Sequence, residues 1–208
     1  MDTTFNLQHF WSQGDSFGHF VTLVLLAMSI LSWGIIFMRL SMYARMRQLS
    51  KGLATFWHNK DHDTRIAALA PFDKEHLLTP LAQLANTSND TATLERKLSH
   101  AARLAHQHLD KGLTLLATVA SSAAFVGLLG TVWGIYRTLT TVAAQGQMDI
   151  SHIIGPVGEA LIMTAFGLAV ALPALFAYNF FSRNNQFIQT EIDAFAHDIL
   201  NLHATKVD

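Results

Sequence analysis

A single carboxyl group lies inside a long apolar segment in the second half of the chain. Glu159 is the charged residue of GPVGEALIMTAFGLAVALPALFAYNFF, which runs from Gly155 to Phe181. Placing a carboxylate inside a membrane costs roughly 2.5–3.5 kcal/mol on insertion scales, so such a group marks a functional site, and proton handling is one usual function. We therefore expect Glu159 to belong to a proton pathway. The alternative is a position at the outer membrane interface, because Glu159 follows the start of the segment closely.

Hydroxyl side chains recur along the preceding apolar segment at intervals built from threes, fours and sevens. They are Thr114, Thr118, Ser121, Thr131, Thr138 and Thr141. Each hydroxyl alone means little, because it can donate to the carbonyl one helical turn back. Together they predict one broad stripe that faces a polar interior. Thr164 lies five residues after Glu159, roughly 140° around a helix, so the two are not stacked but can border one cavity.

Glycines form a further pattern in the segment GLLGTVWGIYRTL. Gly127, Gly130 and Gly134 share one helix face, and the last two make a GxxxG motif. A glycine costs about 1 kcal/mol in a helix interior, and in lipid small residues allow two helix backbones to pack closely. We expect close helix packing here, with incidental glycines as the alternative. The remaining predicted packing positions are Gly158, Gly167 and Pro173, the last of which should kink its helix.

The composition indicates a membrane protein. Half of the 208 residues are hydrophobic and only 14% are charged, whereas soluble domains contain about a quarter charged residues. Crossing a bilayer takes about 20 apolar residues, and three stretches are long enough: 17–38, 113–142 and 153–181. A soluble protein with three buried helices is the alternative, but it would need a larger polar shell.

Other features of the sequence exclude several function classes. The chain has no cysteine, so a disulfide framework or a thiolate metal site is excluded. Its net charge of −1 gives no reason to expect nucleic acid as a partner. We expect no catalytic residues, no metal and no cofactor. The start of the chain lacks a basic region and a cleavage site, so we do not expect a cleaved signal peptide.

The placement of basic residues predicts the orientation. Eleven of the fourteen Lys and Arg residues lie between Arg39 and Lys111, and the positive-inside rule makes that region cytoplasmic. The basic run Arg39, Arg45, Arg47 and Lys51 should meet anionic phospholipid headgroups of the bilayer. The predicted segments are a periplasmic N-terminus at 1–16, spans at 17–38, 113–142 and 153–181, cytoplasmic regions at 39–112 and 182–208, and a periplasmic loop at 143–152.

The second and third helices should extend beyond the membrane into the cytoplasm. No proline interrupts residues 91–142, and about fifty helical residues span roughly 75 Å, against about 30 Å of hydrocarbon. We expect one continuous helix there, starting after Asn89 or Asp90 as N-cap. Pro156 suits the first turn of the third helix. The apolar faces should comprise Leu94, Leu98, Ala101, Leu104, Ala105 and Leu109 in one helix, and Phe187, Ile188, Ile192, Phe195, Ile199 and Leu202 in the other.

Taken together, two motifs resemble the ExbB/TolQ/MotA proton-channel family. GLLGTVWGIYRTL is similar to the family's second-span signature, and GPVGEALIMTAFGLAVALPALFAYN is similar to its third-span signature. The strong match covers about 60 residues, and both motifs occur in order at the expected separation. The residues of the second motif are more similar to the ExbB branch of the family than to the TolQ branch.

The resemblance implies an all-α membrane protein with three transmembrane helices that forms a pentameric pore in the bacterial inner membrane. It implies that Thr131, Thr164 and Glu159 line a proton pathway. An ExbD-type partner would lie inside the pore. The complex would use the proton-motive force to drive a TonB-type protein, which energises uptake of iron–siderophores, haem and vitamin B12 across the outer membrane.

Three rival functions remain at this point. A TolQ-type subunit that maintains the outer membrane is the nearest, and its partner would distinguish it. A passive membrane scaffold is a second, although a scaffold has no use for Glu159. An intramembrane enzyme is a third, but the spans contain no credible nucleophile and base.

Overall fold

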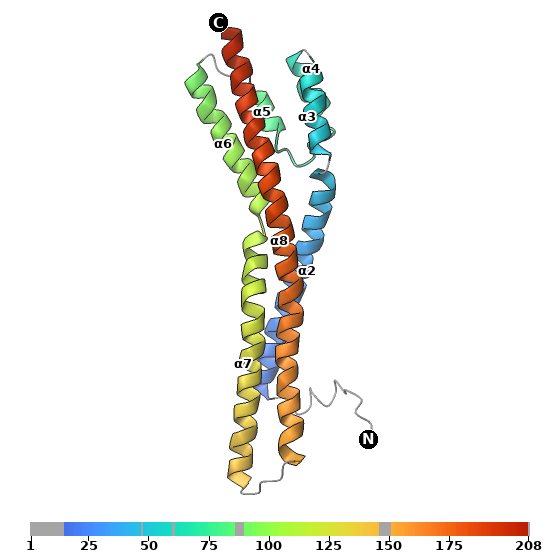
Figure 1. The fold of residues 1–208 in the computed structure, drawn as a ribbon, viewed down its shortest axis with the longest axis vertical. Helices are drawn as coiled ribbons and strands as arrows, with labels where there is room; N and C mark the ends of the chain where they lie inside the picture. The colour runs from blue at the N-terminus through green and yellow to red at the C-terminus, as the bar shows by residue number, and fades with distance from the viewer. Residues whose placement is uncertain (1–14, 47, 60, 86–89, 146–150, 208) are drawn as a thin grey trace. The chain divides into compact units, whose positions relative to one another are not determined.

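The computed structural model describes residues 15–46, 48–59, 61–85, 90–145 and 151–207. Over these residues the chain forms α-helices and no strand, which confirms the predicted all-α fold class. The helices are α2 (Ser16–Met46), α3 (Leu49–His58), α4 (His62–Leu69), α5 (Thr79–Leu84), α6 (Thr91–Asp110), α7 (Leu113–Gln145) and α8 (Ser151–Val207) (Figure 1). Residues 1–14 of the predicted N-terminus and residues 146–150 of the predicted loop lie outside the described residues.

Three helical segments of the described chain are long and apolar enough to cross a membrane. They begin at Ser16, Thr91 and Ile153, and their most apolar windows have mean hydropathies of 2.4, 1.9 and 2.2. The chain divides into two compact units: unit 1 comprises Met1–Ile36 and Thr114–Tyr178, and unit 2 comprises Phe37–Leu113 and Asn179–Asp208.

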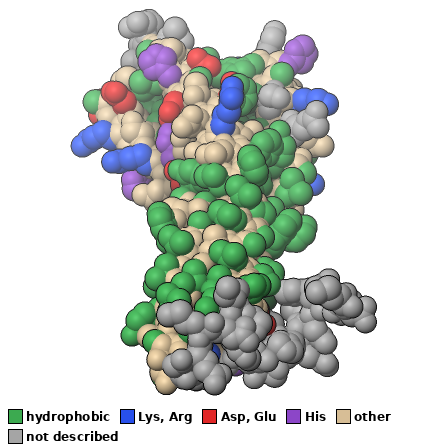
Figure 2. All heavy atoms as spheres, turned by 60° about the horizontal axis from the view of Figure 1, so that its bottom comes forward, with side chains coloured by type: hydrophobic (Ala, Val, Ile, Leu, Met, Phe, Trp, Pro, Cys, Tyr) green, Lys and Arg blue, Asp and Glu red, His purple; other side chains and the backbone are tan. Residues whose placement is uncertain are grey.

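Unit 1 has an apolar surface. Phe125 and Phe176 are 71% and 70% exposed, and many leucines of α2, α7 and α8 are also exposed. Figure 2 shows hydrophobic side chains over much of its visible surface, while most visible charged and His side chains lie on unit 2. Extended apolar surface of this kind indicates contact with lipid or with further helices.

Unit 2 has its own hydrophobic core. The buried residues recur at helical spacing on α6 and on α8, and α3, α5 and the α4–α5 loop add Phe56, Leu77, Leu78 and Leu81. The core contains Leu94, Leu98, Ala102, Ala105, Leu109, Ile188, Ile192, Phe195 and Ile199. Four residues predicted on these faces are not among its buried members: Leu104 is 53% exposed, Phe187 is 64% exposed, and Ala101 and Leu202 are partly buried.

The prediction of one continuous helix over 91–142 is wrong. Asp90 caps the N-terminus of α6 by accepting a hydrogen bond from the Thr93 amide at 3.0 Å, as one of the two predicted caps. The helix then ends at Asp110, because Gly112 adopts φ 81°, a left-handed conformation that ends helices. α7 begins directly afterwards at Leu113.

Side chains from two other helices satisfy the carbonyls at this break. Arg39 of α2 is only 4% exposed and donates to the Lys111 carbonyl. Asn185 of α8 donates to the Leu109 carbonyl and to Asp110 Oδ1. Arg39 was predicted to meet lipid headgroups, but the structure buries it at the helix break. The reason is that the final carbonyls of a helix need donors.

Arg45, another member of the basic run, forms an ion pair with Glu75 at 3.0 Å and keeps a half-exposed side chain. One further sequence expectation is corrected, on α8. Pro156 lies in the second turn of α8, not the first, because the helix already begins at Ser151. α8 continues through both Pro156 and Pro173. Arg47 lies outside the described residues.

A buried carboxylate organises the turn between α4 and α5. Asp73 is 1% exposed and accepts hydrogen bonds from the amides of Leu77, Leu78 and Thr79 at 2.8, 2.9 and 2.6 Å. The Thr79 hydroxyl also lies 2.7 Å from Asp73 Oδ2. These bonds start α5 where its own sequence supplies no side-chain cap.

We predict that Asp73→Ala destabilises unit 2 by about 2–4 kcal/mol, because buried amides left without an acceptor each cost about 1–3 kcal/mol. The unfolding midpoint of the detergent-solubilised protein, followed by circular dichroism, measures the effect. Asp63→Ala changes an exposed carboxylate on α4 and serves as the control. Equal midpoints for the two variants would contradict the role assigned to Asp73.

Candidate functional site

The structure joins two of the predicted pathway residues across α7 and α8. The Thr131 hydroxyl is hydrogen-bonded to the Thr164 hydroxyl, and Thr131 is only 6% exposed. Thr131 Oγ1 also lies 3.2 Å from the Gly127 carbonyl and 3.1 Å from the Ala160 carbonyl. A hydroxyl has one proton to donate. Thr131 therefore donates to one acceptor at a time and can accept from Thr164.

Glycines bring the two helices close enough for this contact. A Cβ added at Gly127 would lie 2.6 Å from the Met163 carbonyl oxygen and 2.9 Å from Gly167 Cα, and one at Gly167 would lie 2.7 Å from the Ala123 carbonyl oxygen. Such distances are too short for any side chain. Gly127 and Gly167 lie one turn from Thr131 and Thr164 in sequence, so the glycine contact sets the separation of the two hydroxyls.

The other predicted packing glycines differ in how closely they approach a neighbouring helix. A Cβ at Gly134 would lie 2.8 Å from Ala160 Cβ, and one at Gly130 would lie 3.1 Å from Val21 Cγ1 of α2. A Cβ at Gly158 would meet nothing within 4 Å in the described chain. Gly158 therefore has no close helix contact within these residues.

Glu159 lies close in sequence to residues that form the hydroxyl contact. It precedes Ala160, whose carbonyl lies within hydrogen-bonding distance of Thr131, and its side chain is half-buried. α8 thus supplies both Glu159 and Thr164, and α7 supplies Thr131. The two hydroxyls are therefore in contact across α7 and α8, and Glu159 lies five residues before Thr164 on α8.

The predicted single stripe of hydroxyls is wrong. Thr131 and Thr138 are buried, whereas Thr114, Thr118, Ser121 and Thr141 are exposed. Three of the exposed hydroxyls, on Thr118, Ser121 and Thr141, donate to carbonyls of their own helix. The ten residues from Ser121 to Thr131 turn a helix roughly 80° short of three full turns, which moves the later hydroxyls to another face.

A polar cluster at the start of α2 was missed by sequence reasoning. Trp133 Nε1 donates to Asp15 Oδ2 at 2.7 Å, the Gly18 amide donates to Asp15 Oδ1 at 2.8 Å, and Arg137 lies 3.9 Å from Asp15. Partial burial alone would raise the pKa of Asp15, but the bonds from Trp133 and Gly18, together with Arg137, lower it overall. The signal was present, because an Asp directly before an apolar helix is an N-cap pattern. This cluster gives Arg137 a partner.

Comparisons with known proteins agree with the motifs. The family model for the MotA/TolQ/ExbB proton channel family matches residues 66–194. "Biopolymer transport protein ExbB" from Xanthomonas campestris pv. campestris is 38% identical over 214 residues, covering 93% of this chain and 85% of that protein. The ExbB of Neisseria meningitidis serogroup B is 34% identical over 213 residues, covering 93% and 95%.

A relative of the rival type is also similar. "Tol-Pal system protein TolQ" from Pseudomonas aeruginosa is 31% identical over 205 residues, covering 90% of this chain and 87% of that protein. Both kinds of relative belong to one family, and the family model covers more than half of the chain. The chain therefore belongs to the MotA/TolQ/ExbB proton channel family.

Proposed function

We propose that this protein is a proton-channel and motor subunit of the inner membrane, which couples the proton-motive force to TonB-dependent uptake across the outer membrane. Its cargo would be iron–siderophores, haem or vitamin B12, and an ExbD-type protein and a TonB-type protein would be its partners. The observation that supports the proposal is the Thr131–Thr164 hydroxyl pair on two helices that pack closely at glycines, with Glu159 five residues before Thr164 on α8.

The family's relatives support the ExbB type over the TolQ type. Relatives named ExbB reach 38% identity over nearly the whole chain, while the TolQ of Pseudomonas aeruginosa reaches 31%. A TolQ-type role in a Tol-Pal envelope system is the second candidate, on the strength of that relative. A passive scaffold accounts for neither Glu159 nor the hydroxyl pair.

The coupling step follows from the chemistry of the site. Moving one elementary charge through 100 mV releases about 2.3 kcal/mol. A protonated carboxyl can face an apolar wall, while an ionised one needs polar neighbours. Thr131, Thr164 and Glu159 would supply these neighbours to a carboxylate of the partner. Alternate protonation of that carboxylate would then shift the partner's helix inside the pore.

Assembly and orientation complete the proposal. A pentamer would place α7 and α8 around a central pore. The N-terminus would be periplasmic, and residues 39–112 and 182–208 would be cytoplasmic. The support for this orientation is the concentration of Lys and Arg between Arg39 and Lys111.

The site assignment predicts that Glu159→Ala, Thr131→Val and Thr164→Val reduce coupling by about tenfold or more while assembly persists, because losing one hydrogen bond in the pathway costs about 1–1.5 kcal/mol. Growth on chelated iron measures coupling, in a bacterium that lacks its own ExbB and TolQ and expresses the ExbD-type and TonB partners. Thr141→Val removes an exposed hydroxyl bonded to its own helix and should grow as wild type.

Wild-type growth of all three site variants would overturn the site assignment. A wild-type chain that assembles but restores no growth on chelated iron, and instead restores detergent tolerance, would favour the TolQ-type role. Either conclusion requires that each variant be present in the membrane at the wild-type level.

The orientation is tested with single cysteines, since the chain has none of its own. A membrane-impermeant maleimide added to spheroplasts should label Thr140→Cys, at the periplasmic end of α7, and should not label Thr190→Cys, on the cytoplasmic part of α8. Both side chains are exposed in the structure, so burial does not explain a difference. Labelling of only Thr190→Cys would reverse the proposed topology.

A further inference from the structure

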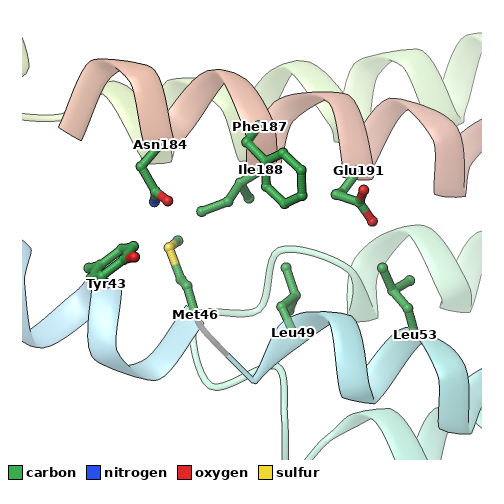
Figure 3. Close-up of a pocket in the computed structure, with 8 residues that line it drawn as sticks. All are labelled: Tyr43, Met46, Leu49, Leu53, Asn184, Phe187, Ile188 and Glu191. Atoms are coloured by element: carbon green, nitrogen blue, oxygen red, sulfur yellow. The ribbon is translucent and has the colours of Figure 1, made fainter. Parts of the chain in front are cut away.

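Unit 2 contains an apolar pocket between α8 and the segment formed by the end of α2 and the start of α3. Its volume is ≈ 250 Å³. Figure 3 shows side chains of α8 on one side, facing those of α2 and α3 on the other. The residues that line the pocket are Tyr43, Met46, Leu49, Leu53, Asn184, Phe187, Ile188 and Glu191.

The pocket has a buried apolar wall and an exposed rim. Met46, Leu49 and Ile188 are 5–7% exposed and belong to the core of unit 2. Phe187 is 64% exposed on the rim, and Glu191 lies one turn further along α8. Within the described residues, Glu191 makes no ion pair. A ligand for this pocket would therefore carry an apolar group beside a positive charge.

The same chain presents such a pair of groups on α6. Leu104 is 53% exposed, and its neighbour Arg103 is also exposed and has no ion pair among the described residues. α6 packs in unit 2 through the buried face that includes Ala102 and Ala105, so Arg103 and Leu104 point away from their own core. The pocket and this face of α6 are different surfaces of one molecule.

We propose that the pocket receives Leu104 from a second copy of this chain, and that Arg103 of that copy pairs with Glu191. The proposal rests on the homo-oligomer of the proposed function and names the surfaces that build it. A contact between two different surfaces is heterologous, so each copy offers both halves and successive contacts close into a ring when the rotation allows. Leu104 and Phe187, two exposed residues of the predicted apolar faces, would become buried together.

Other occupants fit the pocket less well. Pockets for small-molecule ligands usually measure about 300–1,000 Å³, which exceeds the volume found here. The Glu191 carboxylate would repel the phosphate of an anionic lipid headgroup. A basic juxtamembrane segment of another protein shares the required chemistry, and the experiment below separates it from a second copy.

Cysteine crosslinking in membranes tests the contact, because the native chain is free of cysteine. The double variant Leu104→Cys/Phe187→Cys should form, on mild oxidation, a ladder of covalent oligomers on a denaturing gel. Each single variant should give no ladder. Mixed expression of the two single variants should stop at a dimer, as a heterologous contact requires. The pair Leu104→Cys/Ala67→Cys, with an exposed α4 position outside the pocket, is the matched control.

Charge reversal tests the ion pair independently. Glu191→Arg and Arg103→Glu should each lower the oligomer fraction about tenfold at limiting concentration, measured by light scattering in detergent. The double reversal should restore it. Asp63→Arg, a like change on α4, should have no effect.

The outcomes distinguish this interface from the proposed function itself. A wild-type oligomer of full size that forms no Leu104–Phe187 crosslink and ignores both reversals overturns the interface while leaving the channel function intact. A Glu191→Arg variant that assembles normally but no longer captures a co-expressed partner overturns it as well, because the pocket then serves that partner. A wild-type chain that stays monomeric with its ExbD-type partner present removes the oligomer on which both depend.

Discussion

The close approach of α7 and α8 at Gly127 and Gly167 is the constraint on which the candidate site depends. A Cβ at either glycine would lie within 2.6–2.7 Å of a carbonyl oxygen on the other helix. In lipid no hydrophobic effect draws helices together, so association depends on packing and on interhelical hydrogen bonds. Here the glycines provide the packing, and the short backbone separation lets Thr131 reach both Thr164 and the Ala160 carbonyl.

A hydroxyl pair suits this position because it is polar without being charged. Thr131 has two backbone carbonyls within reach and one side-chain partner, so its single proton can be redirected without breaking the helix contact. Glu159, next to Ala160 in the chain, adds the one group of this stretch that can lose its proton. The site therefore combines a close helix contact with a choice of hydrogen-bond directions for one hydroxyl.

The sequence predicted three helices long and apolar enough to cross a membrane, and Asp90 as one of two possible caps, because apolar length and N-cap chemistry are local properties. The break at Gly112 was not predicted, since the apolar period continues from Leu109 to Leu113 across it, although a glycine directly after Lys111 is a helix stop signal in the sequence. Nor did the sequence predict that Leu104 and Phe187 are exposed. Helical spacing identifies which residues share an apolar face. How many of those residues are buried depends on the neighbouring helices. Asn185 was detectable as a polar residue at a core position.

The break between α6 and α7 is stabilised by side chains of two other helices. Arg39 from α2 and Asn185 from α8 bind carbonyls at the end of α6, so three helices are tied to one short stretch of backbone in unit 2. The left-handed conformation of Gly112 makes α6 and α7 separate helices, so the last carbonyls of α6 need donors from elsewhere. The buried side chains of Arg39 and Asn185 meet that need, and Asn185 does so from α8, which continues as one helix from Ser151 to Val207.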